Sequence, residues 1–312
     1  MKITDMILTD FRTEVCPCIR PLADCEDLSQ EEFDGYGNAY FAETDGFLCI
    51  FMPYVPHVVA EPRTAFVDSY YWTSQRIYRL KNELISFLKG ASFENACYFE
   101  GSYKALVFSL GIGRFLRNTL IWIKPFGTFF CMEVIDLQGK GAAELPKASF
   151  GLEDKGCADC GRCSRACLTG ALKPDSFDAG RCVRQKQFEK ASLDDPLNHL
   201  YGNKLLGCND CQTACPMNAG VTAKATKPSP DYYRMFDLDE FALACCSPGF
   251  KSSEYAAVYG VNYAKPMKIL GQLLVAMKND DPSRHVEAVR RCRALGNPNA
   301  NPILDEWLER FG

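Results

Sequence analysis

The chain has 312 residues and a formal net charge of −4, a balance that argues against a broadly basic nucleic-acid-binding protein. Its length suggests two or three domains. Its 17 cysteines stand out, because the first residues show no apolar secretory leader and cysteine clusters in cytoplasmic proteins usually bind metal. The most apolar stretch is interrupted by Lys124, Pro125 and Gly127 and is a poor membrane-spanning helix. We therefore expect a cytoplasmic metalloprotein without membrane contact, and we disfavour a disulfide-bonded secreted protein.

The first part of the chain, residues 1–150, is predicted to mix strands and helices. Residues 46–55 and 119–135 are rich in β-branched and aromatic side chains, which favours strands. Within 119–135 we expect a pair of strands joined around Pro125–Gly127, because proline and glycine are typical of turns.

Two helices are predicted between these strands. Residues 69–90 have helical apolar spacing and end at Gly90, a residue that suits a helix C-terminus. Their expected buried face consists of Ile77, Leu80, Leu84 and Leu88. Residues 101–118 are expected to form a helix that leads into a glycine-containing loop.

The remainder of the chain differs in composition. Residues 151–230 carry the dense cysteine runs, with turn residues and few strand signals. Residues 231–312 are predicted to be mostly helical, with helices near 266–279, 283–297 and 302–312.

Two cysteine runs have the spacing by which ferredoxin-type segments bind [4Fe–4S] clusters. The first run has gaps of two, two and three residues, and the second has gaps of two and three followed by proline. Thiolates are soft ligands that suit iron–sulfur clusters and zinc. The runs consist of Cys157, Cys160, Cys163 and Cys167, and of Cys208, Cys211 and Cys215.

Two clusters need four thiolates each, and Cys182, which lies between the runs, is the natural addition to the seven. The fourth cysteine of such a run ligates the other cluster. We therefore predict cluster 1 on Cys157, Cys160, Cys163 and Cys215, and cluster 2 on Cys167, Cys182, Cys208 and Cys211. The alternative is one zinc ion on Cys157, Cys160, Cys208 and Cys211, which leaves the rest of the first run unexplained.

These motifs resemble the double-cluster module of the epoxyqueuosine reductase family. The matching segments are "CADCGRCSRACLTGAL", "FDAGRCVRQ" and "LLGCNDCQTACPMN", and the resemblance extends upstream to "FSLGIGRFLRNTLIWIKPFGTFFCMEVI" and "CIFMPYVP". It covers roughly residues 46–280 and suggests a divergent member with a shortened N-terminus. The resemblance implies an α+β fold: a corrinoid-type α/β domain in 1–150, the ferredoxin-like module in 151–230 and a helical region in 231–312.

The resemblance also implies a cofactor and a reaction. Members of that family bind cobalamin without a histidine ligand and reduce it with single electrons from two [4Fe–4S] clusters. In this chain the implied cobalamin-binding residues are Gly111, Gly113 and Asn118. The three isolated histidines are then surface or structural residues: His57, His199 and His285.

The chain departs from the family pattern at three places. The aspartate that is the family's proposed proton donor aligns with Cys97, and Glu100 is the nearest carboxylate, so both are candidate catalytic acids or plain structural residues. The glycine loop carries the bulky pair Phe115–Leu116. Arg117 replaces the usual lysine, and the two are not interchangeable at a precise site.

Five further cysteines leave a third metal site open. On the simpler interpretation these five are free thiols. They could form a metal site only if they lie close together in the fold. They are Cys16, Cys18, Cys25, Cys245 and Cys246.

Three functions remain open at this point. The first is an epoxyqueuosine reductase-like oxidoreductase of queuosine biosynthesis, acting on a modified nucleoside in tRNA or a related substrate, with a flavodoxin or ferredoxin-like electron donor. The second is a ferredoxin-like electron-transfer protein without cobalamin, and the third is a reductase of a corrinoid held on a partner protein. Contact with tRNA needs basic side chains near the site, for which the candidates are Arg162, Arg165, Arg181, Arg184 and Lys186.

Overall fold

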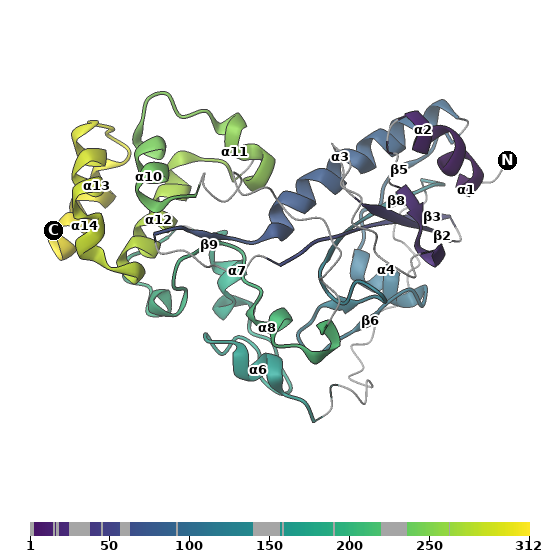
Figure 1. The fold of residues 1–312 in the computed structure, drawn as a ribbon, viewed down its shortest axis with the longest axis horizontal. Helices are drawn as coiled ribbons and strands as arrows, with labels where there is room; N and C mark the ends of the chain where they lie inside the picture. Colours follow the sequence, from purple (N-terminus) through teal and green to yellow (C-terminus); the bar gives the residue numbers. More distant parts are fainter. Residues whose placement is uncertain are drawn as a thin grey trace. The chain divides into compact units, whose positions relative to one another are not determined.

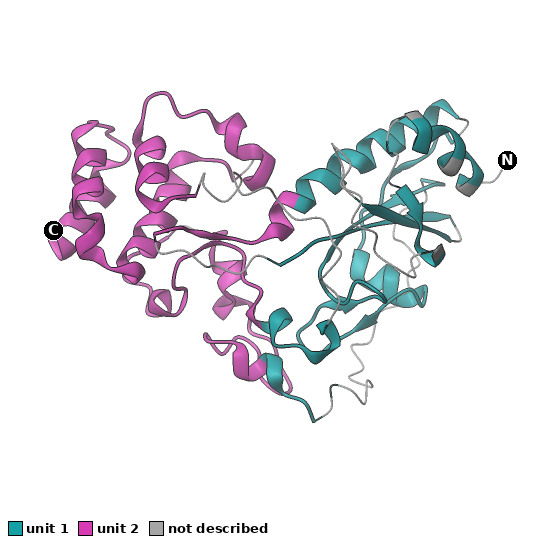
Figure 2. Cartoon of the chain, viewed as in Figure 1, with its two compact units in different colours: residues 1–56, 73–163, 211–227 teal, residues 57–72, 164–210, 228–312 magenta. Residues whose placement is uncertain are grey.

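The structure is a computed structural model that divides into two compact units (Figure 2). Unit 1 comprises 1–56, 73–163 and 211–227, and unit 2 comprises 57–72, 164–210 and 228–312. The described residues are 3–14, 16, 19–24, 38–44, 46–56, 63–91, 93–139, 157, 159–189, 191–219, 236–261 and 263–312.

A five-stranded sheet forms the middle of unit 1, in the order β1-β2-β3-β8-β5 (Figure 1). β1 and β2 are parallel, and the other neighbouring strands are antiparallel. Six consecutive residues of β3 are buried, as expected for a central strand covered on both faces. The strands are β1 (Ile19–Pro21), β2 (Ala39–Thr44), β3 (Phe47–Pro53), β5 (Cys97–Tyr98) and β8 (Phe130–Asp136).

The predicted long helix of unit 1 is confirmed as α3 (Ser69–Gly90), whose first four residues belong to unit 2. All four residues of its expected apolar face are buried. The second predicted helix is shorter than expected: α4 (Tyr103–Ser109) starts at the N-cap Ser102, whose hydroxyl accepts a hydrogen bond from the Ala105 amide. The short α1 (Ile3–Met6), the π-helical turn Ile7–Phe11, α2 (Arg12–Glu14) and the 3₁₀ turn Leu22–Asp24 complete the helical segments described in unit 1 outside the cluster runs.

The strand pair predicted over 119–135 differs from the structure. β7 (Ile121–Trp122) pairs with β6 (Arg114–Phe115) in a small two-stranded sheet, whereas β8 pairs with β3 and β5. A tight turn closed by an Ile123–Gly127 bridge, with a cis Lys124–Pro125 peptide bond, joins the two strands. The predicted turn around Pro125–Gly127 is confirmed, but β7 and β8, which it joins, belong to different sheets.

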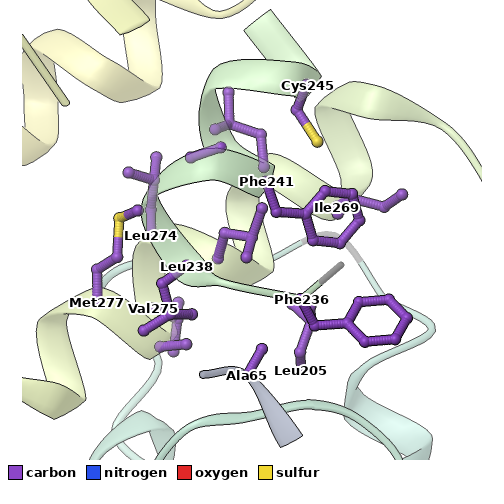
Figure 3. Close-up of a cluster of buried hydrophobic side chains, with 14 of the residues drawn as sticks. Ala65, Leu205, Phe236, Leu238, Phe241, Cys245, Ile269, Leu274, Val275 and Met277 are labelled. Atoms are coloured by element: carbon purple, nitrogen blue, oxygen red, sulfur yellow. The ribbon is translucent and has the colours of Figure 1, made fainter. Parts of the chain in front are cut away.

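Helices dominate the C-terminal part of unit 2, as predicted. They are α10 (Leu238–Cys246), α11 (Ser252–Tyr259), α12 (Pro266–Asp280), α13 (Pro282–Ala294) and α14 (Asn301–Phe311). Their apolar side chains form one core with the short parallel pair β4 (Phe66–Val67) and β9 (Lys204–Leu206) (Figure 3). The Trp307 indole, fully buried, donates to the Leu274 carbonyl and joins α14 to α12.

Short helical turns occupy the cysteine-rich region: α6 (Arg162–Ala166), α7 (Val183–Lys186), α8 (Asp210–Thr213), and the 3₁₀ turns Ala179–Arg181, Asn198–Leu200 and Pro216–Asn218. The α+β class is therefore confirmed. The three consecutive domains remain a prediction, since each compact unit is built from separate stretches of chain. No helix in the described part of the chain is long and apolar enough to cross a membrane.

Candidate metal centre

Four cysteines of unit 1 line one solvent-open cavity. They are Cys157, Cys160, Cys163 and Cys215, the set predicted for cluster 1; all four are partly exposed, and none forms a disulfide with another described residue. The structure therefore brings the predicted ligands of cluster 1 together. Arg117, Asn118, Arg162 and Met217 also line the cavity.

The first cysteine run bends around this cavity at Gly161. Its φ of +58° lies in the left-handed region, where a side chain is strained. The Cys160 amide donates to the Cys157 carbonyl before this bend, and α6 begins directly after it. A two-residue gap between cysteines thus becomes a tight loop with thiols on its inner side.

A buried amide network fixes the second cysteine run within unit 1. The Gln212 side-chain amide donates to the Thr128 carbonyl at 2.9 Å and to its hydroxyl at 3.1 Å. The Asn218 side chain donates to the same hydroxyl and to the Gln212 carbonyl, and it accepts from the Thr128 amide. Cys215 lies between these two anchors, so the turn after β7 holds it in place.

Two further contacts tie the same run to the β6–β7 region. The Trp122 indole donates to the Met217 carbonyl at 3.0 Å, and the Asn118 side-chain amide donates to the Cys211 carbonyl at 3.4 Å. Sequence reasoning missed Trp122, Thr128, Gln212 and Asn218 as supporting residues. The sequence offered one sign of such a supporting role: the polar residue Thr128 lies within the apolar stretch 119–135.

The thiols of this cavity influence one another electrostatically. The pKa of Cys215 is raised first by burial, and the negative charges of Cys157, Cys163 and Cys160 raise it further. Iron binding needs thiolates, and the positive charge of the iron relieves this repulsion. Four thiols around one cavity are the donor set of a [4Fe–4S] cluster.

No three histidine, cysteine or carboxylate side chains among the described residues lie close enough to ligate a single metal ion. A zinc ion draws its thiolates to about 3.8 Å from one another, because each tetrahedral Zn–S bond is about 2.3 Å long. A cube bonds each thiolate to a different iron atom and holds the sulfurs farther apart.

Three of the four residues predicted for cluster 2 lie in unit 2, and Cys211 is the first residue of the last stretch of unit 1. The Cys167 and Cys182 segments are linked through Thr169, whose hydroxyl lies 3.7 Å from the Cys167 sulfur and whose carbonyl accepts from Arg181 Nε. Burial raises the pKa of Cys208 to about 12. The assignment of cluster 2 stays a prediction.

The residue after α7 connects the Cys182 and Cys208 segments. Gln187 accepts from the Gly207 amide at 2.6 Å and donates to the carbonyls of Gly207 and Lys204. Within unit 2, then, hydrogen bonds join the three segments that carry Cys167, Cys182 and Cys208.

The implied cobalamin-binding residues do not form a cradle together. A Cβ on Gly113 would lie 2.9 Å from Ile121 Cγ1 and from Ile123 Cγ1, so the chain's own hairpin fills that space. Asn118 is buried, and its side chain bonds Cys211 and the Leu120 amide. Gly111 alone of the three faces open space. Gly113 and Asn118 therefore serve the chain's own packing, and of the three residues only Gly111 leaves room for a bound group.

The two candidate acids lie at the edge strand of the sheet and just beyond it. Cys97, on β5, pairs in register with Asp136, and Glu100 is exposed. Burial, and then the charge of Asp136, raise the pKa of Cys97. The Cys97 thiol therefore keeps its proton at neutral pH.

A charged cluster near this edge was missed by sequence reasoning. Glu133 on β8 accepts from Lys81 Nζ at 2.6 Å and from the Tyr103 hydroxyl at 3.1 Å. Lys81 also lies over the rings of Tyr78 and Tyr98. Burial and the Glu133 charge raise the pKa of Tyr103. The sequence signal for this cluster was Glu133, a carboxylate in the middle of an otherwise apolar stretch of β8.

The remaining predicted residues are distributed over both units. His199 is exposed and His285 is fully buried between two carboxylates, so both are surface or structural residues; His57 lies outside the described residues. Cys16 is buried in unit 1, and Cys18 and Cys25 lie outside the described residues. Cys245 and Cys246 are buried in α10, where Cys246 hydrogen-bonds Cys292 of α13.

The basic candidates for tRNA contact have partners of different kinds. Arg162 and Arg165 are exposed on α6. Arg181 bonds Thr169, Arg184 stacks on Tyr70 at 4.1 Å, and Lys186 pairs with Glu189 and Asp195, so these three side chains also have structural contacts.

Comparison with known proteins finds a double-cluster domain in the cysteine-rich region and similarity to epoxyqueuosine reductases. Residues 156–218 match the family model described as "4Fe-4S double cluster binding domain". The chain is 26% identical over 209 residues to an epoxyqueuosine reductase of Salmonella typhimurium, and 31% identical over 208 residues to one of Shigella dysenteriae. Each alignment covers 64% of this chain and 50% of the relative, so the chain spans about half the length of the curated relatives it matches.

Solved structures share the fold at lower identity. The epoxyqueuosine reductase from Streptococcus thermophilus is 20% identical, with a TM-score of 0.63 and coverage of 84% of this chain and 71% of that chain. An epoxyqueuosine reductase crystallised with an epoxyqueuosine-modified tRNA stem loop is 21% identical, with a TM-score of 0.57 and coverage of 85% and 76%. In its double-cluster segment, its sequence and its fold, this chain is similar to epoxyqueuosine reductases.

Proposed function

We propose that the chain is an oxidoreductase that passes single electrons through two [4Fe–4S] clusters to an acceptor at the α/β unit. The observation that carries this proposal is the placement of Cys157, Cys160, Cys163 and Cys215 around one cavity in unit 1. The Thr128 network makes the Cys215 segment part of the same unit as the five-stranded sheet. An electron on cluster 1 is therefore held at the α/β unit.

The ligand assignment is tested by counting iron after anaerobic reconstitution. The full chain should hold about eight irons, and Cys215→Ala and Cys182→Ala should each lose about four, because each removes one thiolate from a different cube. Cys97→Ala is the matched control, since Cys97 is a half-exposed thiol outside both sets. An unchanged iron count in Cys182→Ala would show that another residue completes cluster 2.

The proposed acceptor is cobalamin, which supplies a strongly nucleophilic reduced metal when bound. Similarity to epoxyqueuosine reductases supports this choice, and the open space at Gly111 is compatible with it, whereas Gly113 and Asn118 serve the chain's own packing. The chain's own contribution near the sheet edge is a proton, held on the Cys97 sulfur at neutral pH because its pKa is raised. Glu100 is the second proposed donor.

The proposed substrate is a modified nucleoside, in tRNA or free. The support is a relative's solved structure that contains a modified tRNA stem loop. Exposed Arg162 and Arg165 beside the cluster residues are suited to contact phosphates. A flavodoxin or ferredoxin-like protein is the proposed electron donor.

The decisive experiment is corrinoid retention. The reconstituted chain is incubated anaerobically with hydroxocobalamin, separated by gel filtration and examined by absorption spectroscopy. The proposal expects about one corrinoid per chain. Full iron content with no retained corrinoid would contradict the cobalamin-dependent function.

A second function, electron transfer without cobalamin, is favoured by the filled space at Gly113. Under this alternative the α/β unit only docks partners. It predicts full iron content, no retained corrinoid and rapid one-electron exchange with a redox protein. A corrinoid held by a partner protein would instead be reduced in trans by the chain.

A further inference from the structure

The loop between β6 and β7 is held in a strained and well-anchored conformation. Thr119 has φ +64°, a region that β-branched residues rarely adopt. The Thr119 amide donates to the Leu116 carbonyl, and its own carbonyl accepts from Lys104 Nζ at 3.0 Å. Strain of this kind persists where surrounding contacts impose it.

The anchors of this loop fix the residue before Asn118. Leu116 is buried, and its amide donates to the Leu120 carbonyl. Asn118 is buried and bonds both Leu120 and Cys211. Arg117 is thus held between two immobilised neighbours.

Arg117 lines the same cavity as the four cysteines of cluster 1. Its Nε is buried and has no hydrogen-bond partner among the residues that the structure describes. A buried donor without a partner costs about 1–3 kcal/mol, and such atoms in native proteins usually have a partner. The cavity is where a partner for this N–H can lie.

We propose that Arg117 is a positioning residue for cluster 1: its Nε–H donates a charge-assisted hydrogen bond to the cluster's sulfur atoms. This inference rests on the proposed assignment of Cys157, Cys160, Cys163 and Cys215. Charge-assisted bonds to anionic acceptors are stronger than neutral ones. Arginine differs from lysine here, because its planar guanidinium places Nε at a fixed point along the side chain.

The hydrogen bond raises the reduction potential of cluster 1. On reduction the cluster core takes one electron, from 2+ to 1+, and no proton is needed. The added negative charge strengthens its attraction to the guanidinium, so Arg117 stabilises the reduced form more than the oxidised form. Hydrogen bonds to cluster sulfurs are a known lever on potential.

Arg162 offers a matched comparison within the same cavity. Both arginines line it, but Arg162 is exposed at the start of α6, whereas the Arg117 Nε is buried. Water screens an exposed charge far more than a buried one. Replacement of Arg162 should therefore affect the cluster much less.

The test is an anaerobic redox titration of the reconstituted full chain, with dithionite as reductant and the reduced clusters followed by electron paramagnetic resonance. Arg117→Gln should lower the ratio of reduced to oxidised cluster 1 about tenfold at fixed solution potential, which is about 59 mV for one electron. The midpoint potential of cluster 1 should move, and that of cluster 2 should not. Arg162→Gln should move the cluster 1 midpoint much less than Arg117→Gln does.

The proposal is overturned if Arg117→Gln leaves both midpoints where they are, moves both equally, or matches Arg162→Gln. If Arg117→Gln loses iron, Arg117→Lys is titrated instead; it keeps the charge but displaces the donor, and an unmoved midpoint overturns the proposal. Failure of the proposed function is distinguishable, because it appears as a deficit of iron or of bound corrinoid in the unmodified chain.

Discussion

Thr128 joins the α/β fold to the second cysteine run through a single hydroxyl and its backbone. The hydroxyl accepts from both Gln212 and Asn218, and the amide and carbonyl add two further bonds. Because these groups are buried, each side-chain amide depends on the Thr128 hydroxyl for one of its two hydrogen bonds.

Thr128→Val should destabilise the protein by about 2 kcal/mol, because it removes one of the two acceptors from each of two buried amide groups at nearly constant shape. We expect a lower apparent melting temperature and faster loss of iron to a chelator. Thr13→Val is the matched control, since the Thr13 hydroxyl bonds the Thr9 carbonyl on an exposed helical turn. Equal chelation rates for the two variants would contradict the role of this network.

At the scale of elements, the β6–β7 hairpin is shaped by a glycine at its start. The Gly113 position packs against Ile121, Ile123 and the Trp122 carbonyl. The same hairpin carries Trp122 and leads to the loop of Arg117. A shift of this hairpin would therefore reach the cluster cavity.

Gly113→Ala should cost about 1–3 kcal/mol, since its Cβ overlaps two isoleucine side chains at 2.9 Å. Gly90→Ala is the control, because nothing lies within 4 Å of its Cβ position and its φ is not positive. Thermal unfolding of both variants measures the difference. If Gly113→Ala were fully stable but lost corrinoid, the glycine would serve the cofactor rather than the hairpin.

Helices α10, α12 and α13 meet at His285. Its Nδ1 lies 2.6 Å from Asp239 and its Nε2 lies 3.1 Å from Asp280, and the side chain is fully buried. Arg63 binds the other oxygen of Asp239. The histidine bridges two carboxylates of neighbouring helices.

His285→Ala should lower stability by about 3 kcal/mol, because both carboxylates lose a partner and a cavity forms. His199→Ala, at an exposed position on a 3₁₀ turn, should change stability by less than about 0.5 kcal/mol. Calorimetry of the two variants tests this. Equal melting temperatures would contradict the bridging role.

The elements differ in how far the sequence could predict them. Spacing alone located α3 and pointed to the cysteines that line one cavity, because helical periodicity and cluster ligation both need residues at fixed short intervals. The roles of Thr128, and of Glu133 with Lys81 and Tyr103, depend on contacts between residues far apart in the chain. Strands β7 and β8 were located, but their sheet partners depend on tertiary contacts that local propensity does not encode.

At the scale of the whole molecule, the cysteine-rich region is shared by both units. Residues 164–210 belong to unit 2, and Val183, Leu193, Tyr201 and Leu205 are buried in its helical core. The cysteine-rich region therefore supplies the predicted cluster ligands. Its apolar side chains, however, are buried against helices that follow it in the chain.

A fragment of residues 151–230 should fail to hold about eight irons, because it leaves these apolar side chains without the helical core. Anaerobic reconstitution with an iron count and gel filtration measures this, with the full chain as control. A monodisperse fragment with full iron content would show that residues 151–230 form an autonomous domain.

The return of the chain to unit 1 at Cys211 has a consequence for biosynthesis. Cys163 ends the second stretch of unit 1, and Cys215 leaves the ribosome only after residues 164–210. Under the proposed ligand set, cluster 1 cannot be complete until that whole stretch has been translated. Iron delivery is thus a late step of maturation, and a nascent chain stalled before Cys215 would expose three thiols to oxidants.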